Sequence, residues 1–445
     1  MHARATGTAP VRKLHMAPAP LMRHRSVGAD RHNSAMTRPQ HLDQRLILWL
    51  SLAQLVTWGS VFYSFALLVE PIERELGLDR AQTSVAFSLA LLAEGFCAYP
   101  VGRWIDRGHE RVVMAGGSLL LGTSLLLHGF VDSLWMFYLV WILLGVGMAS
   151  TLYAPVFAVV TRRFPDNFRR GIITMTFLGG LASTVFIPLT AWLISAYGWR
   201  QALWCLAALQ FLVCVPLHWC LLRGAPAGRH PVGALVAATD ISRHLRSAPF
   251  LLIGVFVVLV MAVTAAMPPH MVSMLREHGM PETWVIAVPA SIGVIQVVGR
   301  ALLYFFEQNF DLHLANRAIP CLLPLGLLAL LAAPALGAYS AGLGAALVIV
   351  FVLLYGIGNG MNTIVKGTVI AEYVNRPHVA SLNGALGIPL ALARSAAPLS
   401  LGLLWSREAG YSLGLWMLLG VSCLGVAALL LAMRLALAAR CAGQP

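Results

Sequence analysis

The chain has 445 residues, of which 58% are hydrophobic and 11% are charged. Because a soluble domain carries roughly 25% charged residues, this composition excludes an ordinary soluble enzyme or binding module and indicates a membrane protein. The mean hydropathy of +0.76 agrees with that class. The net charge of +13 would suggest a nucleic-acid partner in a soluble protein, but in a membrane protein the placement of the charges along the chain decides their meaning.

Residues 1–45 are rich in Arg, His, Ala and Pro and contain no apolar run of the kind that a signal peptide needs. We expect a disordered basic tail on the cytoplasmic side. Met36 lies just ahead of the first apolar stretch. The sequence therefore leaves open whether the native protein starts at Met1 or at Met36.

Apolar runs of about 20 residues, the length that crosses the hydrocarbon core of a bilayer, recur from Leu46 onward. They predict an all-α membrane protein with twelve transmembrane helices. The expected spans are 46–69, 83–101, 112–130, 135–159, 171–196, 200–222, 249–270, 283–305, 318–336, 342–372, 380–404 and 412–436. A cytoplasmic linker over 223–247 separates a first six-helix bundle, 46–222, from a second, 248–436, and a short cytoplasmic tail follows at 437–445.

Of the 31 Lys and Arg residues, 24 fall in segments that would share one side of the membrane with the N-terminus, and five fall in loops on the other side. This bias predicts that both termini are cytoplasmic, and we expect the membrane to be a bacterial inner membrane. The remaining two cations, Lys366 and Arg394, lie inside predicted helices. The seven cysteines form no C-x-x-C pattern, so neither a metal site nor a cofactor is predicted.

The turn after the second predicted span carries a charged pattern, G-x-x-x-D-R-x-x-x-R, formed by Gly102, Asp106, Arg107 and Arg111. This pattern resembles the signature loop of the major facilitator superfamily, between its second and third membrane helices. The resemblance implies that Gly102 lets one helix end close to its neighbour, and that Asp106, Arg107 and Arg111 form a charged cytoplasmic latch. His109 replaces a glycine of the related pattern, which would alter the latch turn.

The stretch from the first predicted span into the second resembles the monocarboxylate and oxalate–formate branch of that superfamily. The matching residues are Tyr63-Ser64-Phe65, Pro71-Ile72-Glu73, Glu75-Leu76-Gly77, Arg80-Ala81-Gln82 and the run 84–88. The acidic residue that monocarboxylate carriers place early in their first helix is absent. The resemblance implies no enzymatic activity, and two six-helix bundles that rock about a cavity lined by the first, fourth, seventh and tenth helices.

A weak internal repeat supports two related halves. Residues 101–103, Val-Gly-Arg, recur at 298–300, and the Gly-x-Gly of 145–147 recurs at 356–358. Gly77 aligns with Gly279, and Pro188 aligns with Pro398. The offsets between these matches are similar, so they predict a duplicated six-helix unit.

Charged side chains far from the ends of a span are informative, since each costs at least about 2.5 kcal/mol at the bilayer centre. Lys366, Arg394 and Glu94 qualify. Helical spacing places several polar residues of the tenth span on one face with Lys366, namely Tyr355, Asn359, Asn362 and Thr363. We predict that Lys366 and Arg394 attract a carboxylate substrate, and that Tyr63, Tyr355, Asn359 and Asn362 donate oriented hydrogen bonds. A lysine snorkelling to the cytoplasm and a fixed structural ion pair are the open alternatives for the two cations.

Glu94 is the one acidic residue deep in a predicted span, so it could bind a proton. The resemblance places the second and eleventh helices opposite each other, which makes Glu94 and Arg394 possible partners in one conformational state. Their depths, estimated from helical rise, differ by about 10 Å. His270 follows two prolines near the outer end of the seventh span, and we interpret it as a solvated cap.

The sequence therefore predicts a secondary transporter for a small organic anion, with proton symport through Glu94 as the expected energy source. The expected partners are the anionic substrate, protons and the lipid bilayer, without nucleic acid, and the expected state is a monomer. Efflux of an amphipathic drug or metabolite through a cavity dominated by Trp58, Trp141 and Tyr153 is one alternative. A non-transporting membrane sensor or scaffold is another.

Overall fold

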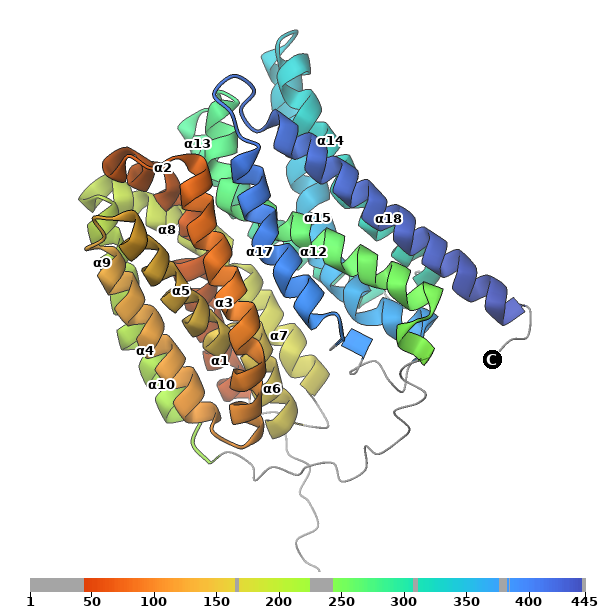
Figure 1. The fold of residues 1–445 in the computed structure, drawn as a ribbon, viewed down its shortest axis with the longest axis horizontal. Helices are drawn as coiled ribbons and strands as arrows, with labels where there is room; N and C mark the ends of the chain where they lie inside the picture. The colour runs from red at the N-terminus through yellow and green to blue at the C-terminus, as the bar shows by residue number, and fades with distance from the viewer. Residues whose placement is uncertain are drawn as a thin grey trace, which may run out of the picture. The chain divides into compact units, whose positions relative to one another are not determined.

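We describe the protein through a computed structural model that covers residues 44–164, 168–224, 243–306, 311–375, 382–383 and 385–441. Helices make up most of these ranges (Figure 1). Most of the predicted N-terminal tail and most of the predicted linker lie outside the described residues.

The first half of the chain builds six spans, and its first, fourth, fifth and sixth spans each consist of consecutive helices. The segments are α1 (Gln44–Thr57), η1 (Trp58–Tyr63), α2 (Phe65–Leu76), α3 (Arg80–Asp106), α4 (Glu110–His128), α5 (Leu134–Thr151), α6 (Tyr153–Arg163), α7 (Phe168–Gly180), α8 (Ala182–Tyr197), α9 (Trp199–Leu209), η2 (Gln210–Cys214) and α10 (Val215–Leu221).

The second half consists of longer, less interrupted helices. They are α12 (Ala248–Glu277), α13 (Glu282–Phe306), α14 (Leu312–Gly337), α15 (Ala341–Tyr373), α17 (Gly387–Leu403) and α18 (Ser412–Cys441). In the described part of the chain, eleven helices are long and apolar enough to cross a membrane, and the shorter apolar α17 completes the twelve predicted spans. Because α18 continues to Cys441, the tail predicted at 437–445 is helical over its first residues.

Glycines at matching positions confirm the internal repeat. Gly77 and Gly279 both adopt a positive φ, 65° and 71°, at the end of a span, a conformation that glycine adopts without strain. Gly145 packs α5 against α3, and its counterpart Gly356 packs α15 against Ile295 of α13. The helix in the fourth position of each half therefore meets the helix in the second position through a glycine.

Two of the helix pairs that join the halves, α3 with α17 and α8 with α13, are closely packed. In the first pair α3 and α17 run antiparallel (Figure 1), and a Cβ at Gly95 would lie 2.5 Å from the Cβ of Ala391. In the second pair, the hydroxyl of Thr184 on α8 donates to the carbonyl oxygen of Ala290 on α13 at 2.6 Å. We call the end of the bundle where α2 meets α3 the Arg80 end, and the end where α3 meets α4 the Asp106 end.

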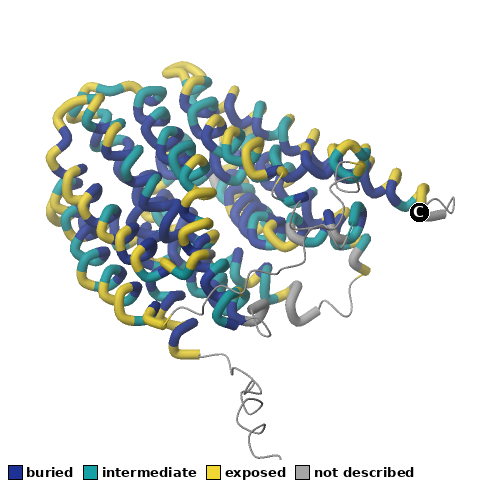
Figure 2. Tube along the Cα trace, turned by 60° about the horizontal axis from the view of Figure 1, so that its bottom comes forward, coloured by how far each residue is buried: buried dark blue, intermediate teal, exposed yellow. Residues whose placement is uncertain are grey.

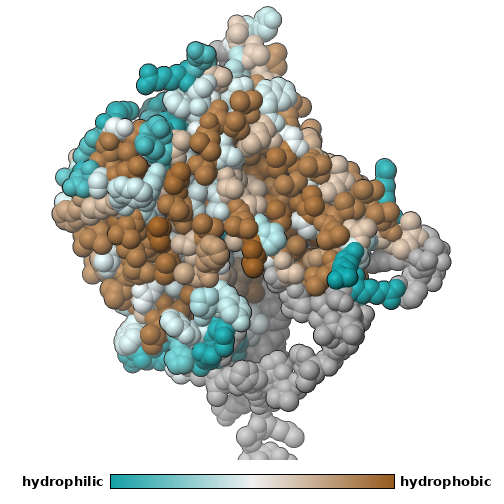
Figure 3. All heavy atoms as spheres, in the orientation of Figure 1, coloured by the Kyte–Doolittle hydropathy of each residue, from teal (hydrophilic) through white to brown (hydrophobic). Residues whose placement is uncertain are grey.

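Buried apolar residues fill each half, and exposed ones cover the outside. One cluster spans α12 to α18 and extends to Ala66, Leu67 and Ile187 of the first half. Figure 2 shows buried segments inside the bundle and exposed segments mainly at the periphery and ends. On the face drawn in Figure 3, hydrophobic side chains form a broad band with hydrophilic residues gathered near its margins, which suits a protein surrounded by lipid.

Two π-helical segments face each other inside the first half, and the sequence pattern gave no sign of them. Ser60 of η1 accepts a hydrogen bond from the Nε2 of Gln210, in η2, at 2.8 Å. The Thr57 hydroxyl, at the start of η1, lies 3.8 Å from the sulfur of Cys214. π-helical turns frequently occur at functional sites, and η1 carries Trp58 and Tyr63 toward the interior of the protein.

Gly145→Ala is expected to lower the midpoint of thermal unfolding, because the added Cβ would overlap the backbone carbonyl of Ala90. Overpacking of this kind costs about 1–3 kcal/mol. Gly116→Ala is the matched control, since a Cβ there would meet nothing within 4 Å. Scanning fluorimetry of the detergent-purified protein measures both variants, and equal midpoints would contradict the described packing of α5 on α3.

Candidate functional site

Aromatic side chains from η1 and α6 meet between the halves. The Trp58 ring centroid lies 5.0 Å from that of Tyr153 and 6.5 Å from that of Tyr63. Tyr153 in turn stacks on Phe157 with centroids 5.2 Å apart and an interplanar angle of 18°. Each of these rings is only partly buried, so this group forms an aromatic wall that a ligand could contact.

Arg300 on α13 reaches across to the same region, and the sequence reasoning missed it. Its Nη1 donates to the carbonyl oxygen of Thr176 on α7 at 2.7 Å. A Cβ at Gly180 would lie 3.0 Å from this Nη1, so a glycine makes room for the guanidinium. The neighbouring Gly179 makes room for the hydroxyl of Tyr153 in the same way. Arg300 and Tyr153 therefore converge on adjacent glycines at the end of α7.

The signal for Arg300 was present in the sequence. Gln296 precedes it by one helical turn and its Oε1 lies 3.5 Å from Arg300 Nη2, so a polar face runs along α13. The guanidinium is also close enough to Tyr63 and Tyr153 to interact electrostatically with both phenols. Arg300 lies inside the predicted span 283–305, and α13 covers the same stretch from Glu282 to Phe306, but this arginine was not among the predicted site residues.

Several polar atoms of η1, α13 and α15 are buried without a hydrogen-bond partner among the described residues. They are the Nε1 of Trp58, the Nε of Arg300, the hydroxyl of Tyr355 and both side-chain amide atoms of Asn362. Most of these groups are donors. Buried donors without partners are costly, so the region is suited to a ligand rich in hydrogen-bond acceptors.

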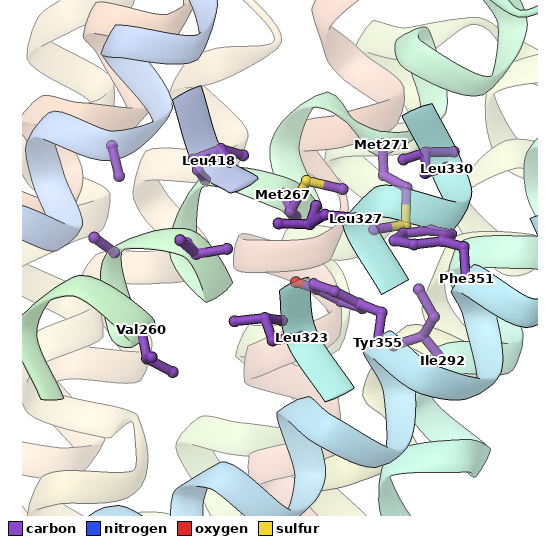
Figure 4. Packing of buried hydrophobic residues seen from close by; sticks show 14 of the residues in the cluster. Val260, Met267, Met271, Ile292, Leu323, Leu327, Leu330, Phe351, Tyr355 and Leu418 are labelled. Carbon is purple, nitrogen blue, oxygen red and sulfur yellow. The ribbon is translucent and has the colours of Figure 1, made fainter. Parts of the chain in front are cut away.

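The predicted site residues of α15 have different environments. Tyr355 is 1% exposed and belongs to the core of the second half. Figure 4 shows its ring extending from α15 among Leu323, Leu327 and Met267. Asn362 is likewise 1% exposed, whereas Asn359 is partly buried. Tyr355 and Asn362 are therefore enclosed by protein in this conformation.

Glu94 and Arg394 lie side by side, as the sequence analysis had hypothesised. The Nη2 of Arg394 is 3.6 Å from the Oε2 of Glu94, and their side chains are 28% and 17% exposed. The predicted difference in depth was wrong because it was measured from predicted helix ends at 101 and 380, whereas α3 ends at Asp106 and α17 begins at Gly387. Close packing of Gly95 on Ala391 brings the two helices together at this level.

Lys366 belongs to the same region. Its side chain is partly buried, and its ammonium lies close enough to the Arg394 guanidinium for the two positive charges to interact. Among the described residues, Arg394 pairs with Glu94, and Lys366 lies close enough to Arg394 to interact with it. This part of the site therefore carries an excess of positive charge.

The predicted latch forms different contacts from those expected. Arg111 donates from Nε to the carbonyl oxygen of Trp219 at 2.7 Å and lies over its ring, so it binds within the first half. Arg107 is exposed, and a Cβ at Gly102 would meet nothing within 4 Å. No described residue therefore approaches Gly102 closely, and the Asp106 side chain lies outside the described residues.

A buried carboxylate beside this loop was missed by the sequence reasoning. Glu110 is fully buried, and its Oε1 accepts a hydrogen bond from the Nε of Arg163 at 2.6 Å. Its other oxygen lies 3.8 Å from Arg162. The charged contacts near the Asp106 end thus tie α4 to α6 inside the first half.

At the Arg80 end, charged side chains join the two halves. The Nη1 of Arg276 on α12 donates to Glu70 on α2, and its Nη2 donates to Glu282 at 2.6 Å. A cavity of about 340 Å³ lies beside these groups and is lined by both halves, but it contains none of the predicted substrate residues.

The interpretation of His270 as a solvated cap was wrong. The side chain is 1% exposed and hydrogen-bonded through both ring nitrogens, to Tyr411 and to the carbonyl oxygen of Pro398. These partners are more than 120 residues away in the sequence, so local sequence could not reveal them.

Two six-helix bundles with charged and polar groups between them are the architecture of a secondary transporter. The family model described as Major Facilitator Superfamily matches residues 50–398, and the chain belongs to that superfamily. Among the described residues, no group of three or more His, Cys, Asp or Glu side chains is arranged to hold a metal ion.

Curated relatives confirm the resemblance to the monocarboxylate and oxalate–formate branch. The chain is 32% identical over 230 residues to monocarboxylate transporter 13 from Bos taurus, covering 49% of this chain and 51% of that protein. It is 29% identical over 143 residues to the oxalate:formate antiporter from Oxalobacter formigenes, covering 32% of this chain and 33% of that protein. The chain therefore spans about half or less of the length of these relatives.

Solved structures confirm the fold. A bacterial homologue of the human lysosomal transporter Spinster, inward-facing and occupied, has a TM-score of 0.67 at 17% identity, covering 89% of this chain and 98% of that one. The nucleoside transporter NupG has a TM-score of 0.63 at 15% identity, covering 87% of this chain and 99% of that one.

A double-mutant cycle tests the contact between Glu94 and Arg394. Residues in direct contact show interaction energies of about 0.5–3 kcal/mol, so Glu94→Gln and Arg394→Gln together should destabilise the protein less than the sum of the single changes. Pairing Glu94→Gln with Arg317→Gln, an exposed arginine on α14, should be additive. Additivity in both cycles, measured by thermal unfolding, would argue against the ion pair.

Proposed function

We propose that this protein is a secondary active transporter that moves a small organic anion bearing a carboxylate. The observation that supports the proposal is the set of unpartnered donors and cations between the halves. The Nε of Arg300 and the Nε1 of Trp58 lack partners among the described residues. Lys366 lies beside Arg394, and Glu94 is the carboxylate that pairs with Arg394 among the described residues. A carboxylate is a hydrogen-bond acceptor with a negative charge. It would therefore accept hydrogen bonds from the unpartnered donors and neutralise the cations.

The three basic residues, Arg300, Lys366 and Arg394, would have different roles in binding the carboxylate because they lie in different places. Arg300 is held by Thr176 and Gln296, which fixes the direction of its guanidinium and leaves its Nε for a ligand. Arginine binds carboxylates through two parallel hydrogen bonds when its plane is fixed. Lys366 and Arg394 would attract the anion to the region, and Tyr63, Asn359 and Asn362 would orient it. Tyr355 would act as a donor only after its enclosing core opens.

The printed names of the curated relatives point to the same substrate class, since they concern a monocarboxylate transporter and an oxalate:formate antiporter. Both matches cover half or less of the relatives. The charges of the site are therefore the main support for a carboxylate substrate, and the relatives add to it.

Proton coupling is proposed to occur at Glu94. Protonation would cancel its charge and release Arg394, which cannot lose its own proton at physiological pH. The released guanidinium would then need another anion, and a substrate carboxylate supplies one. Binding of a proton and binding of the substrate would thereby favour each other.

Ligand binding is expected to stabilise the purified protein against heat. A carboxylate at about 100 times its Kd should stabilise the folded state by about 2.7 kcal/mol. The measurement is a thermal shift screen of mono- and dicarboxylates beside neutral and cationic solutes at two pH values. Arg300→Ala, Lys366→Ala and Arg394→Ala should each remove the shift, and the exposed control Arg317→Ala should keep it. Shifts with cations or lipophiles alone would contradict the proposal.

Glu94→Gln is expected to abolish uphill uptake driven by a proton gradient while leaving exchange of substrate across the membrane. The amide has nearly the volume of the carboxyl group but cannot titrate. Gradient-driven uptake and counterflow in liposomes measure the two activities separately. Uphill uptake equal to that of the wild type would show that the proton binds elsewhere.

Efflux of an amphipathic compound is the second candidate, because the wall formed by Trp58, Tyr153 and Phe157 suits a planar apolar ligand. Trp141, the third aromatic expected to dominate such a cavity, is 1% exposed and packs inside the first half. Efflux of a lipophilic dye that survives Lys366→Ala and Arg394→Ala would favour this function. Measurable substrate flux in liposomes would distinguish these two transport functions from a non-transporting sensor or scaffold.

A further inference from the structure

A group of side chains at the Arg80 end joins the two halves, and we call it the outer gate because the charge bias of the loops predicts that this end faces outward. Its members are Glu73 and Arg80 from the first half and His270, Glu277, Trp405 and Tyr411 from the second. Arg80 is 7% exposed. Its Nε donates to Glu73 at 2.8 Å, and its Nη1 donates to the hydroxyl of Tyr411 and lies 3.7 Å from Glu277.

The hydrogen-bond partners of His270 define where its proton sits. The Nε2 atom lies 2.9 Å from the carbonyl oxygen of Pro398, which can only accept, so Nε2 carries the hydrogen. The Nδ1 atom lies 3.1 Å from the Tyr411 hydroxyl. In the neutral ring Nδ1 can only accept, so it accepts from Tyr411.

Tyr411 connects this histidine to the other half. Burial raises the pKa of Tyr411, against the opposing influence of Arg80, so the phenol keeps its hydrogen. Its oxygen accepts from Arg80 and its hydrogen is donated to His270. One directed chain of hydrogen bonds therefore runs from Arg80 of α3, through Tyr411 and His270, to Pro398 of α17.

This chain accommodates only a neutral imidazole. A proton on Nδ1 would aim a second donor at the Tyr411 oxygen and leave the Tyr411 hydrogen without its acceptor. It would also place a positive charge one hydroxyl group away from Arg80. The carboxylates that face this region, Glu73 of α2 and Glu277 of α12, already pair with Arg80, and Glu277 also accepts from Trp405 at 3.0 Å.

We propose that His270 is a proton-binding site, separate from Glu94, that controls opening of the outer gate. The closed gate holds the neutral ring, and opening exposes the ring to water, where it binds a proton. The proposal rests on the alternation between two conformations that we propose for transport, but it does not depend on the identity of the substrate.

The direction of the pH effect follows from proton linkage. The open gate binds more protons at His270 than the closed gate does, so lowering the pH favours the open gate. If the ring in the open gate has the ordinary histidine pKa of about 6.5, the ratio of open to closed gates rises about tenfold between pH 7.5 and pH 5.5. Acid on the outer side would thus open the protein toward the source of protons.

The test uses a cysteine placed behind the gate. Ser88 is 7% exposed and lies about two helical turns along α3 from Arg80. Ser88→Cys, in a background without the native cysteines, is reconstituted in liposomes and reacted from outside with a membrane-impermeant thiol reagent. Arg407→Cys, in the exposed loop between α17 and α18, corrects for the pH dependence of thiol chemistry. The ratio of the two rates should rise about tenfold from pH 7.5 to pH 5.5.

Two histidine variants separate the role of His270 from general acid effects. His270→Gln can still donate to Pro398 and accept from Tyr411, but it cannot bind a proton, so the rate ratio should change by less than about twofold over the same range. The control variant is His278→Gln. His278 lies two turns further along the chain, and its Nδ1 is 2.6 Å from the Met274 carbonyl oxygen. This variant should keep the full pH response.

Tyr411→Phe provides an independent variant, because it removes the link between Arg80 and His270 without changing the histidine. The cysteine behind the gate should then react rapidly at both pH values. A full pH response in His270→Gln, an unchanged slow rate at pH 7.5 in Tyr411→Phe, or no pH response in the wild type would each overturn the proposal. Because the readout uses no substrate, these results are independent of the proposed carboxylate specificity.

Discussion

A charge inside a membrane-spanning helix is stable only when another group neutralises or solvates it. In this protein several partners come from the opposite half: Arg394 lies beside Glu94, Arg276 beside Glu70, and Arg80 beside Glu277. The interactions that make the charges tolerable therefore also hold the halves together. When the halves separate, these charged side chains need new partners. Water, a proton or an anionic substrate can fill that role.

Close helix packing sets the positions of these partners. Gly95 lets α3 approach Ala391 of α17, which brings Glu94 within 3.6 Å of Arg394. Gly180 leaves space for Arg300 to cross from α13 to α7. Glu94 and Arg80 lie on the same helix, α3, and Arg394 and Pro398 lie on α17, so the proposed proton site and part of the outer gate share these two helices.

The sequence predicts those features of the fold that depend on local residue patterns. Hydropathy gives the spans, and the repeated glycines give the two related halves. The pairing of Glu94 with Arg394 required the family resemblance, because the two residues are 300 positions apart. Arg300 could have been found from Gln296, one turn before it on the same face. The outer gate could not have been found from the sequence, because His270 contacts Pro398 and Tyr411 only through tertiary packing. The π-helical turn at Trp58 likewise depends on packing against Gln210 and not on periodicity.

The central claim is that paired charges between the halves separate at one end as the other end closes. Spin labels at Arg74 and Arg407 report the distance between the halves at the Arg80 end, and labels at His109 and Arg317 report it at the Asp106 end; all four positions are exposed. Pulsed electron spin resonance should show the first distance lengthening and the second shortening when the pH is lowered with a bound carboxylate. Two unchanged distances, or two that change in the same direction, would contradict the account.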